Sequence, residues 1–269
     1  MNPKTEILLI AGRARKAKAE GQDIVDGTIG MLMDDSGKLA DLPAVTAQLR
    51  EPLDLSYPPI AGDPAFTQGV FTWVFGKQAE KARLNNSVSV FGTLGGTGAV
   101  FMAMRFAGLE RFEILGPGIG WPNYVTIAEA NGLSYRPYGI FDDQGNFGFA
   151  NIEKLVSRDA GKFRGFLIIV NDPCQNPTGY SLSPAEGQEI FDRLNAIADH
   201  YHTRIDVLFD VAYLDFAASR PTWIEKISRG ETGPVSSLIA FSCSKNFGVN
   251  GIRLAAPVAL FPKRNRDQP

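Results

Sequence analysis

The sequence predicts an α/β protein with a mainly parallel sheet, preceded by an N-terminal arm. Between residues 85 and 260, short apolar runs alternate with amphipathic helical segments, which is typical of strands joined by crossover helices. The run 166–170 (FLIIV) is apolar at every position, as expected for a strand that is covered on both faces. The first sixty residues lack this alternation, and prolines 43, 52, 58 and 59 interrupt them.

The N-terminal segment predicts an amphipathic helix. Its apolar run of five residues is followed by Arg13, Arg15, Lys16 and Lys18, and it is too short for a signal peptide. Further along the chain we expect strands at 87–91, 166–170, 205–209, 238–241 and 254–261.

A helix is predicted after the 166–170 strand. Ser183 and Glu186 have the spacing of a capping box, and Pro184 suits the first helical position. The apolar residues that follow fall on one helical face: Ile190, Leu194, Ile197, Ala198 and Tyr201.

Composition excludes several classes of function. The 269 residues suffice for one large domain or two small ones, and the net charge of −2 gives no reason to expect nucleic acid or a membrane as partner. No stretch reaches the length of a transmembrane helix. Two cysteines are too few for a disulfide framework, which predicts a cytoplasmic location. The two histidines sit in one segment and supply a metal site poorly, so we expect no metal.

Four predicted strands run into polar or glycine-rich segments. These segments are 92–98 (GTLGGTG), 171–179 (NDPCQNPTG), Asp210 and 242–245 (SCSK). Because ligands of open α/β sheets bind beyond the carboxyl ends of the strands, we expect all four endings to meet in one crevice.

Each feature of this crevice also has a plainer interpretation. The glycine turn, followed by a helix starting near Gly98, suits a phosphate, but its spacing fits neither a dinucleotide fingerprint nor a P-loop. Asp210 is also consistent with a helix cap or a structural ion pair. Lys245 can become a nucleophile when it is desolvated, although a lone lysine is usually a solvated surface charge.

Taken together, the motifs resemble the fold-type I enzymes that depend on pyridoxal phosphate (PLP), specifically the aspartate and aromatic aminotransferases. The matching segments occur in the family's order: 57–62 (YPPIAG), 95–99 (GGTGA), 121–124 (WPNY), 176–179 (NPTG), 210–213 (DVAY) and 242–253 (SCSKNFGVNGIR). The resemblance implies a three-layer α/β/α PLP-binding large domain over 61–269. Residues 1–60 would form the arm and part of a small domain.

The resemblance also implies roles for individual residues. Lys245 would hold PLP as an internal aldimine and move the proton, and Asp210 would pair with the pyridine nitrogen. Asn176 and Tyr213 would bind the ring oxygen, and Trp121 would stack on the ring. Read alone, each of these five is more often an ordinary polar, core or surface residue.

The remaining roles concern the phosphate, the substrate and the partner subunit. The phosphate would be held by Gly96, Thr97, Ser242, Ser244 and Arg253. Tyr57 would reach the phosphate of a neighbouring subunit, which implies a homodimer. Ile29, Gly30 and Asn123 match positions beside the substrate.

The chain departs from the family pattern in three places. Gly95 replaces a common Ser, and Tyr124 replaces a His that contacts the ring-pairing Asp in the aspartate enzymes. The chain also ends 24 residues after Lys245, so we expect a fragment that lacks the C-terminal domain and its carboxylate-binding arginine.

The resemblance predicts a PLP-dependent aminotransferase that moves the amino group of an L-amino acid, of the aspartate or aromatic type, to a 2-oxo acid. Two alternatives stay open. One is another PLP reaction on the same scaffold, such as β-elimination or carbon–carbon cleavage. The other is a truncated, catalytically incompetent fragment that binds PLP weakly or serves as an interaction module.

Overall fold

The fold was obtained as a computed structural model, and it describes residues 3–263 except 26, 28, 29, 37, 41, 53–55, 58, 61 and 110. The chain forms two compact units, Met1–Glu51 and Pro52–Pro269. The first unit contains helices α1 (Pro3–Ala19) and α2 (Pro43–Gln48). The predicted N-terminal helix is therefore present, and the predicted division at residue 60 stays a prediction.

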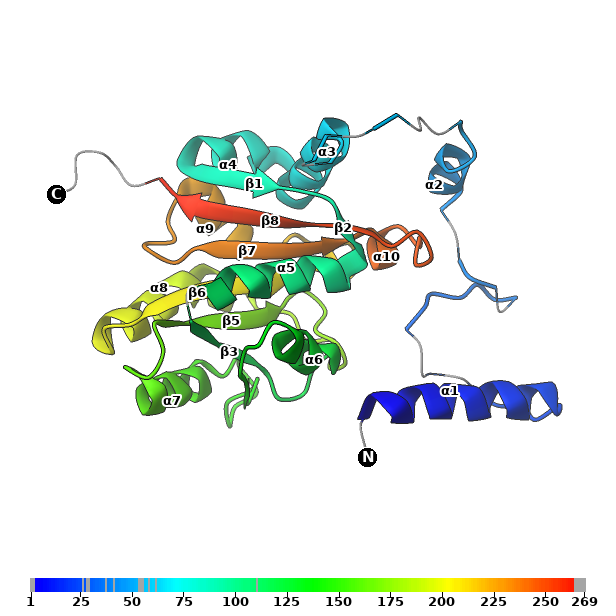
Figure 1. The fold of residues 1–269 in the computed structure, drawn as a ribbon, viewed down its shortest axis with the longest axis horizontal. Coiled ribbons are helices and arrows are strands. Elements are labelled where there is room, and N and C mark those ends of the chain that lie inside the picture. The colour runs from blue at the N-terminus through cyan, green and yellow to red at the C-terminus, as the bar shows by residue number, and fades with distance from the viewer. Residues whose placement is uncertain are drawn as a thin grey trace. The chain divides into compact units, whose positions relative to one another are not determined.

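An eight-stranded sheet forms the centre of the second unit (Figure 1). Its strands follow the order β1-β8-β7-β6-β5-β3-β4, and β2 pairs with β8. Neighbours among β3 to β7 run parallel, whereas β8 is antiparallel to β1, β2 and β7. The strands span Asn86–Val90 (β1), Thr93–Leu94 (β2), Phe112–Pro117 (β3), Tyr135–Tyr138 (β4), Gly165–Asn171 (β5), Arg204–Asp210 (β6), Ser237–Ser242 (β7) and Leu254–Pro262 (β8).

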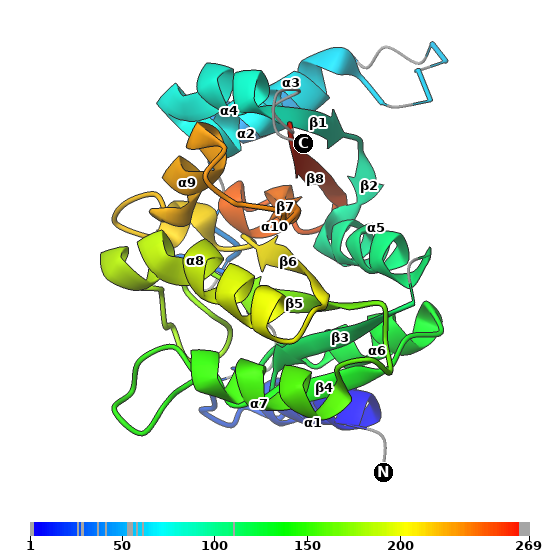
Figure 2. The same ribbon diagram turned by 90° about the vertical axis from the view of Figure 1, so that its left-hand side faces the viewer.

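Helices cover both faces of this sheet, with α5 and α6 on one side and α8 and α9 on the other (Figure 2). The helical segments span Pro64–Phe75 (α3), Gly76–Gln78 (η1), Ala79–Asn85 (α4), Gly95–Leu109 (α5), Asn123–Ala130 (α6), Phe149–Asp159 (α7), Pro184–His200 (α8), Leu214–Phe216 (η2), Trp223–Arg229 (α9) and Cys243–Asn246 (α10). The predicted three-layer α/β/α architecture with a mainly parallel sheet is confirmed.

Strand β5 shows how the sequence builds the three layers. Phe166, Ile168 and Val170 pack in the core beneath α3, α7, α8 and α9, while Leu167 and Ile169 pack beneath α5 and α6. Alternate side chains of a strand point to opposite faces, so a strand buried on both sides must be apolar throughout.

Helix α8 begins where its sequence indicates. The Ser183 hydroxyl accepts from the Glu186 amide, the Glu186 carboxylate accepts from the Ser183 amide, and Pro184 follows at the first turn. Helix α5, in contrast, begins at Gly95 rather than near Gly98, because the short strand β2 pairs with β8 and ends directly before it.

Candidate active site

A cavity of about 310 Å³ lies at the edge of the sheet where β5, β6 and β7 end. We call it the carboxyl-edge cavity. Polar residues from all four predicted strand endings line it, as expected from the sequence. It brings together these residues singled out in the sequence: Gly96, Thr97, Trp121, Asn123, Tyr124, Asn176, Asp210, Tyr213, Ser242, Ser244, Lys245 and Arg253.

Asp210 is the last residue of β6, and its carboxylate is almost fully buried. The Tyr124 hydroxyl donates to Oδ2 over 2.6 Å, and the Ala212 amide donates to Oδ1 over 3.1 Å. Burial raises the pKa of the Asp210 carboxyl, and the two hydrogen bonds oppose that shift. Among the residues that the structure describes, no lysine, arginine or histidine forms an ion pair with it.

Tyr124 keeps its proton beside this carboxylate. Burial, together with the charge of Asp210, raises the pKa of the Tyr124 hydroxyl well above its usual value. The hydroxyl therefore donates to Asp210 throughout the neutral pH range. Trp121 packs edge-on against the Tyr124 ring, with centroids 5.3 Å apart.

Asn171 connects the ending of β5 to that of β6. Its Nδ2 donates to the Asp210 carbonyl over 2.8 Å, and its Oδ1 accepts from the Asn176 amide over 2.8 Å. Sequence reasoning placed Asn171 in a polar segment but assigned it no role, because its partner Asp210 lies on another strand.

Lys245 lies in α10, the single turn that follows β7. Ser242 caps this turn by accepting from the Ser244 amide over 3.3 Å. The Lys245 side chain is half-buried, and burial followed by the nearby Arg253 charge lowers the pKa of its amine. A lowered pKa increases the fraction of neutral, nucleophilic amine at neutral pH.

Arg253 places a second positive charge in the cavity. Its Nη1 donates to the Ser244 hydroxyl over 3.2 Å and to the Asn250 carbonyl over 3.1 Å. Gly95, with φ of +68°, lies so close that a Cβ there would sit 2.3 Å from Arg253 Nη2. A Cβ at Gly96 would sit 3.2 Å from the Ser242 Cβ. A side chain at either glycine would therefore require Arg253 or Ser242 to shift in this structure.

The remaining predicted site residues are Tyr57, Gly30 and Ile29. Tyr57 is 97% exposed and does not line the carboxyl-edge cavity. Gly30 belongs to the first unit, and Ile29 lies outside the described residues. Ala212 and Asn250 also line the cavity; both lie in the matched segments 210–213 and 242–253, but neither was assigned a role of its own.

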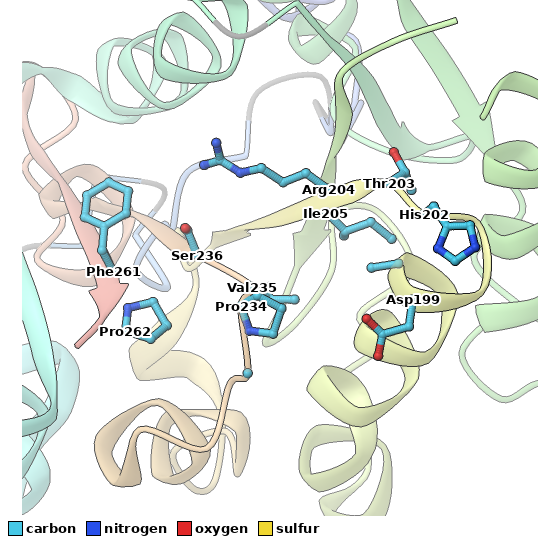
Figure 3. Close-up of a pocket in the computed structure, with 12 residues that line it drawn as sticks. Asp199, His202, Thr203, Arg204, Ile205, Pro234, Val235, Ser236, Phe261 and Pro262 are labelled. Atoms are coloured by element: carbon cyan, nitrogen blue, oxygen red, sulfur yellow. The ribbon is translucent and has the colours of Figure 1, made fainter. Parts of the chain in front are cut away.

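A second cavity of about 840 Å³ lies at the opposite edge of the sheet, where β6 and β7 begin and β8 ends (Figure 3). We call it the amino-edge cavity. Much of its lining is apolar, including Ile205, Pro234, Val235 and Phe261. Asp199 and His202 also line it, and its Arg204 pairs with Asp206 over 2.8 Å.

Within the described residues, no group of three or more His, Cys, Asp and Glu side chains could hold a metal ion. None of the described helices combines the length and apolar character needed to cross a membrane.

Comparison with known proteins agrees with this geometry. The family described as Aminotransferase class I and II matches residues 23–260. The chain belongs to this family. An aromatic-amino-acid aminotransferase of Paracoccus denitrificans is 27% identical over 266 residues, which cover 95% of this chain and 63% of that protein. A tyrosine aminotransferase of Rhizobium meliloti is 29% identical over 258 residues, covering 93% of this chain and 62% of that protein.

Solved aminotransferase structures match as well. An aminotransferase of Anaerococcus prevotii superposes with a TM-score of 0.84 at 28% identity, covering 96% of this chain and 64% of that one. An aromatic-amino-acid aminotransferase of Burkholderia pseudomallei, described as covalently bound to pyridoxal phosphate, has the same fold with a TM-score of 0.72 at 21% identity; the match covers 88% of this chain and 58% of that one. This aminotransferase-family chain thus spans about 60% of the length of these four proteins.

Proposed function

We propose that this chain supplies the PLP-binding part of an aminotransferase that moves the amino group of an L-amino acid, of the aspartate or aromatic type, to a 2-oxo acid. One observation carries the proposal. Asp210 is the last residue of β6, and Lys245 follows the end of the adjacent strand β7. Both residues line one cavity, which Arg253 also lines. The names of the aromatic and tyrosine aminotransferases among its relatives support the same reaction.

The residues of the carboxyl-edge cavity fit PLP. Among its described lining residues, the charged side chains are two cations, Lys245 and Arg253, and one carboxylate, Asp210. Arg253, Ser244 and the glycine turn at Gly95 form an end suited to a phosphate, because a guanidinium and helix amides are strong donors to anions. Among the described residues, no cationic side chain forms an ion pair with the buried Asp210 carboxylate, and the protonated ring nitrogen of PLP would supply a positive charge there.

When bound, PLP would supply an electron-withdrawing ring that stabilises negative charge at the carbon that loses its proton. Lys245 would hold the cofactor covalently through Nζ, and the same nitrogen would accept and return a proton. Asp210, oriented by Tyr124, would hold a proton at the ring nitrogen. Asn176 and Tyr213 would bind the ring oxygen.

The phosphate and the ring face would be held by residues that all line the cavity: Gly96, Thr97, Ser242, Ser244, Arg253 and Trp121. Asn123, also in the lining, would contact the substrate together with Ile29 and Gly30. The proposal includes a PLP-binding domain over 61–269.

The proposal also includes a homodimer in the cytoplasm. The exposed Tyr57 side chain, outside the cavity of its own chain, supports a role at a neighbouring subunit. The unpaired Cys174 and Cys243 support a reducing compartment.

The test is amino transfer with the full chain, PLP, an L-amino acid and a 2-oxo acid acceptor. We expect an amino-acid product that depends on the acceptor and disappears in Lys245→Ala. Lys226→Ala is the matched control, because Lys226 lies on α9 and pairs with Asp192. Ammonia and a 2-oxo acid released without an acceptor would show a lyase instead. PLP binding without any turnover would indicate a catalytically incompetent PLP-binding fragment.

A further inference from the structure

Gln175 is a buried residue whose side chain uses all of its hydrogen-bonding capacity. It lies in the segment that leaves β5 and is 4% exposed. Its Nε2 donates to the carbonyl of Ile119 over 2.7 Å and to that of Asn176 over 2.9 Å. Its Oε1 accepts from the amide and the hydroxyl of Thr178, over 3.1 Å and 2.6 Å. A side-chain amide has two donors and two principal acceptor sites, so every one is occupied.

These bonds join two segments that leave different strands. Ile119 follows β3 and precedes Trp121 by two residues, while Asn176 follows β5. Trp121 and Asn176 both line the carboxyl-edge cavity, whereas Gln175 lies outside its lining. Gln175 therefore fixes the spacing of two cavity walls without facing the cavity itself.

The link closes a circuit of contacts along one side of the cavity. From Asn176 the circuit continues through Asn171 to the carbonyl of Asp210. The Asp210 carboxylate accepts a hydrogen bond from the Tyr124 hydroxyl, and the Tyr124 ring packs against Trp121. The bond from Gln175 to the Ile119 carbonyl joins the Trp121 segment back to Asn176.

We propose that Gln175 is a positioning residue of the cofactor site, which holds Trp121 and Asn176 at the separation that PLP requires. This inference rests on the proposed function. Loss of the Nε2 donors leaves two backbone carbonyls without this partner, and the segment carrying Trp121 then shifts relative to Asn176.

Two substitutions test this role. Gln175→Glu keeps the size of the side chain but replaces both Nε2 donors with a carboxylate oxygen, and Gln175→Ala removes all four bonds. Gln188→Glu is the matched control, because Gln188 is a half-buried residue on α8 whose Nε2 donates to the Thr222 carbonyl, outside the cavity.

The measurements are the dissociation constant for PLP and the visible circular dichroism per bound cofactor, which reports how firmly the ring is held. Hydrogen–deuterium exchange of residues 117–124 without cofactor reports the link itself. We expect about tenfold weaker PLP binding, reduced dichroism and faster exchange in both Gln175 variants, with Gln188→Glu like the parent.

The outcomes separate this inference from the proposed function. A parent chain that binds PLP, with Gln175 variants that bind it equally well, would overturn the inference and leave the function standing. A parent chain that binds no PLP would overturn the function. The exchange data would then decide whether Gln175 links the two segments, and unchanged exchange in both variants would overturn that link.

Discussion

The two cavities of the sheet differ in size and in how their charged groups are used. The amino-edge cavity is larger, at about 840 Å³ against about 310 Å³, yet its Arg204 is already paired with Asp206 and packs over the Phe112 ring. In the carboxyl-edge cavity, neither Arg253 nor Asp210 forms an ion pair with a described side chain of opposite charge. A buried carboxylate that forms no ion pair with a described cation, such as Asp210, indicates a binding site better than cavity volume does.

The largest expected effect is that of Asp210→Asn. This change removes the charge that would face the ring nitrogen, and we expect amino transfer to fall by roughly two to three orders of magnitude. Asp206→Asn is the control on the same strand, because Asp206 is also buried but serves the amino edge. Steady-state rates of amino transfer at saturating PLP measure the difference. Equal losses of rate in the two variants would contradict a special role for the carboxyl edge.

The two arginines give the next largest difference. Arg253→Gln removes a charged donor to the phosphate, so we expect PLP to bind roughly 10- to 100-fold more weakly. Arg204→Gln leaves Asp206 buried without its cation, so it lowers the free energy of unfolding instead. Cofactor titration and chemical denaturation of both variants measure the two effects. Weaker PLP binding in Arg204→Gln, with unchanged PLP binding in Arg253→Gln, would place the phosphate site at the amino edge instead.

A pair of glycines tests the close approach of the glycine turn to Arg253. Gly95 and Gly132 both have positive φ, but a Cβ at Gly132 would meet nothing within 4 Å. We expect each Ala variant to lose about 1 kcal/mol of stability from backbone strain. Only Gly95→Ala also weakens PLP binding, by about tenfold, because the new Cβ displaces Arg253. Equal PLP affinity in the two variants would show that the contact with Arg253 is irrelevant.

The smallest effect concerns Asp172, near the carboxyl edge. Burial raises the pKa of its carboxyl to about 6, while Trp223 and Leu182 donate to it. A carboxyl whose folded pKa exceeds its unfolded value near 3.8 favours folding increasingly as the pH falls. Relative to Asp172→Asn, we expect the parent to gain about 1 kcal/mol of unfolding free energy between pH 7 and pH 5. Denaturant titrations at the two pH values measure this gain, and no relative gain would contradict the burial of a charge there.

The sequence predicted the elements whose causes are local. The capping box of Ser183 and Glu186 lies within four residues, and the β5 strand follows from its continuous apolar run. The meeting of four strand endings followed from the general geometry of parallel sheets, and it placed Lys245, Asp210 and Asn176 together.

What the sequence could not predict depends on contacts between distant segments. The start of α5 shifted to Gly95 because β2 pairs with β8. The role of Asn171 depends on Asp210, 39 residues away, and that of Gln175 depends on Ile119, 56 residues away. Neither pairing has a signal in a single sequence, because a buried amide reveals its partners only in the folded chain.

The central claim is that Lys245 at the carboxyl edge is the residue that holds PLP. The most direct measurement is to incubate the chain with PLP, reduce it with borohydride and map the modified peptide by mass spectrometry. We expect one equivalent of reduced PLP on Lys245 in the parent chain, and far less than one equivalent of reduced PLP in Lys245→Ala. Label on another lysine, or an undiminished level in the variant, would contradict the claim.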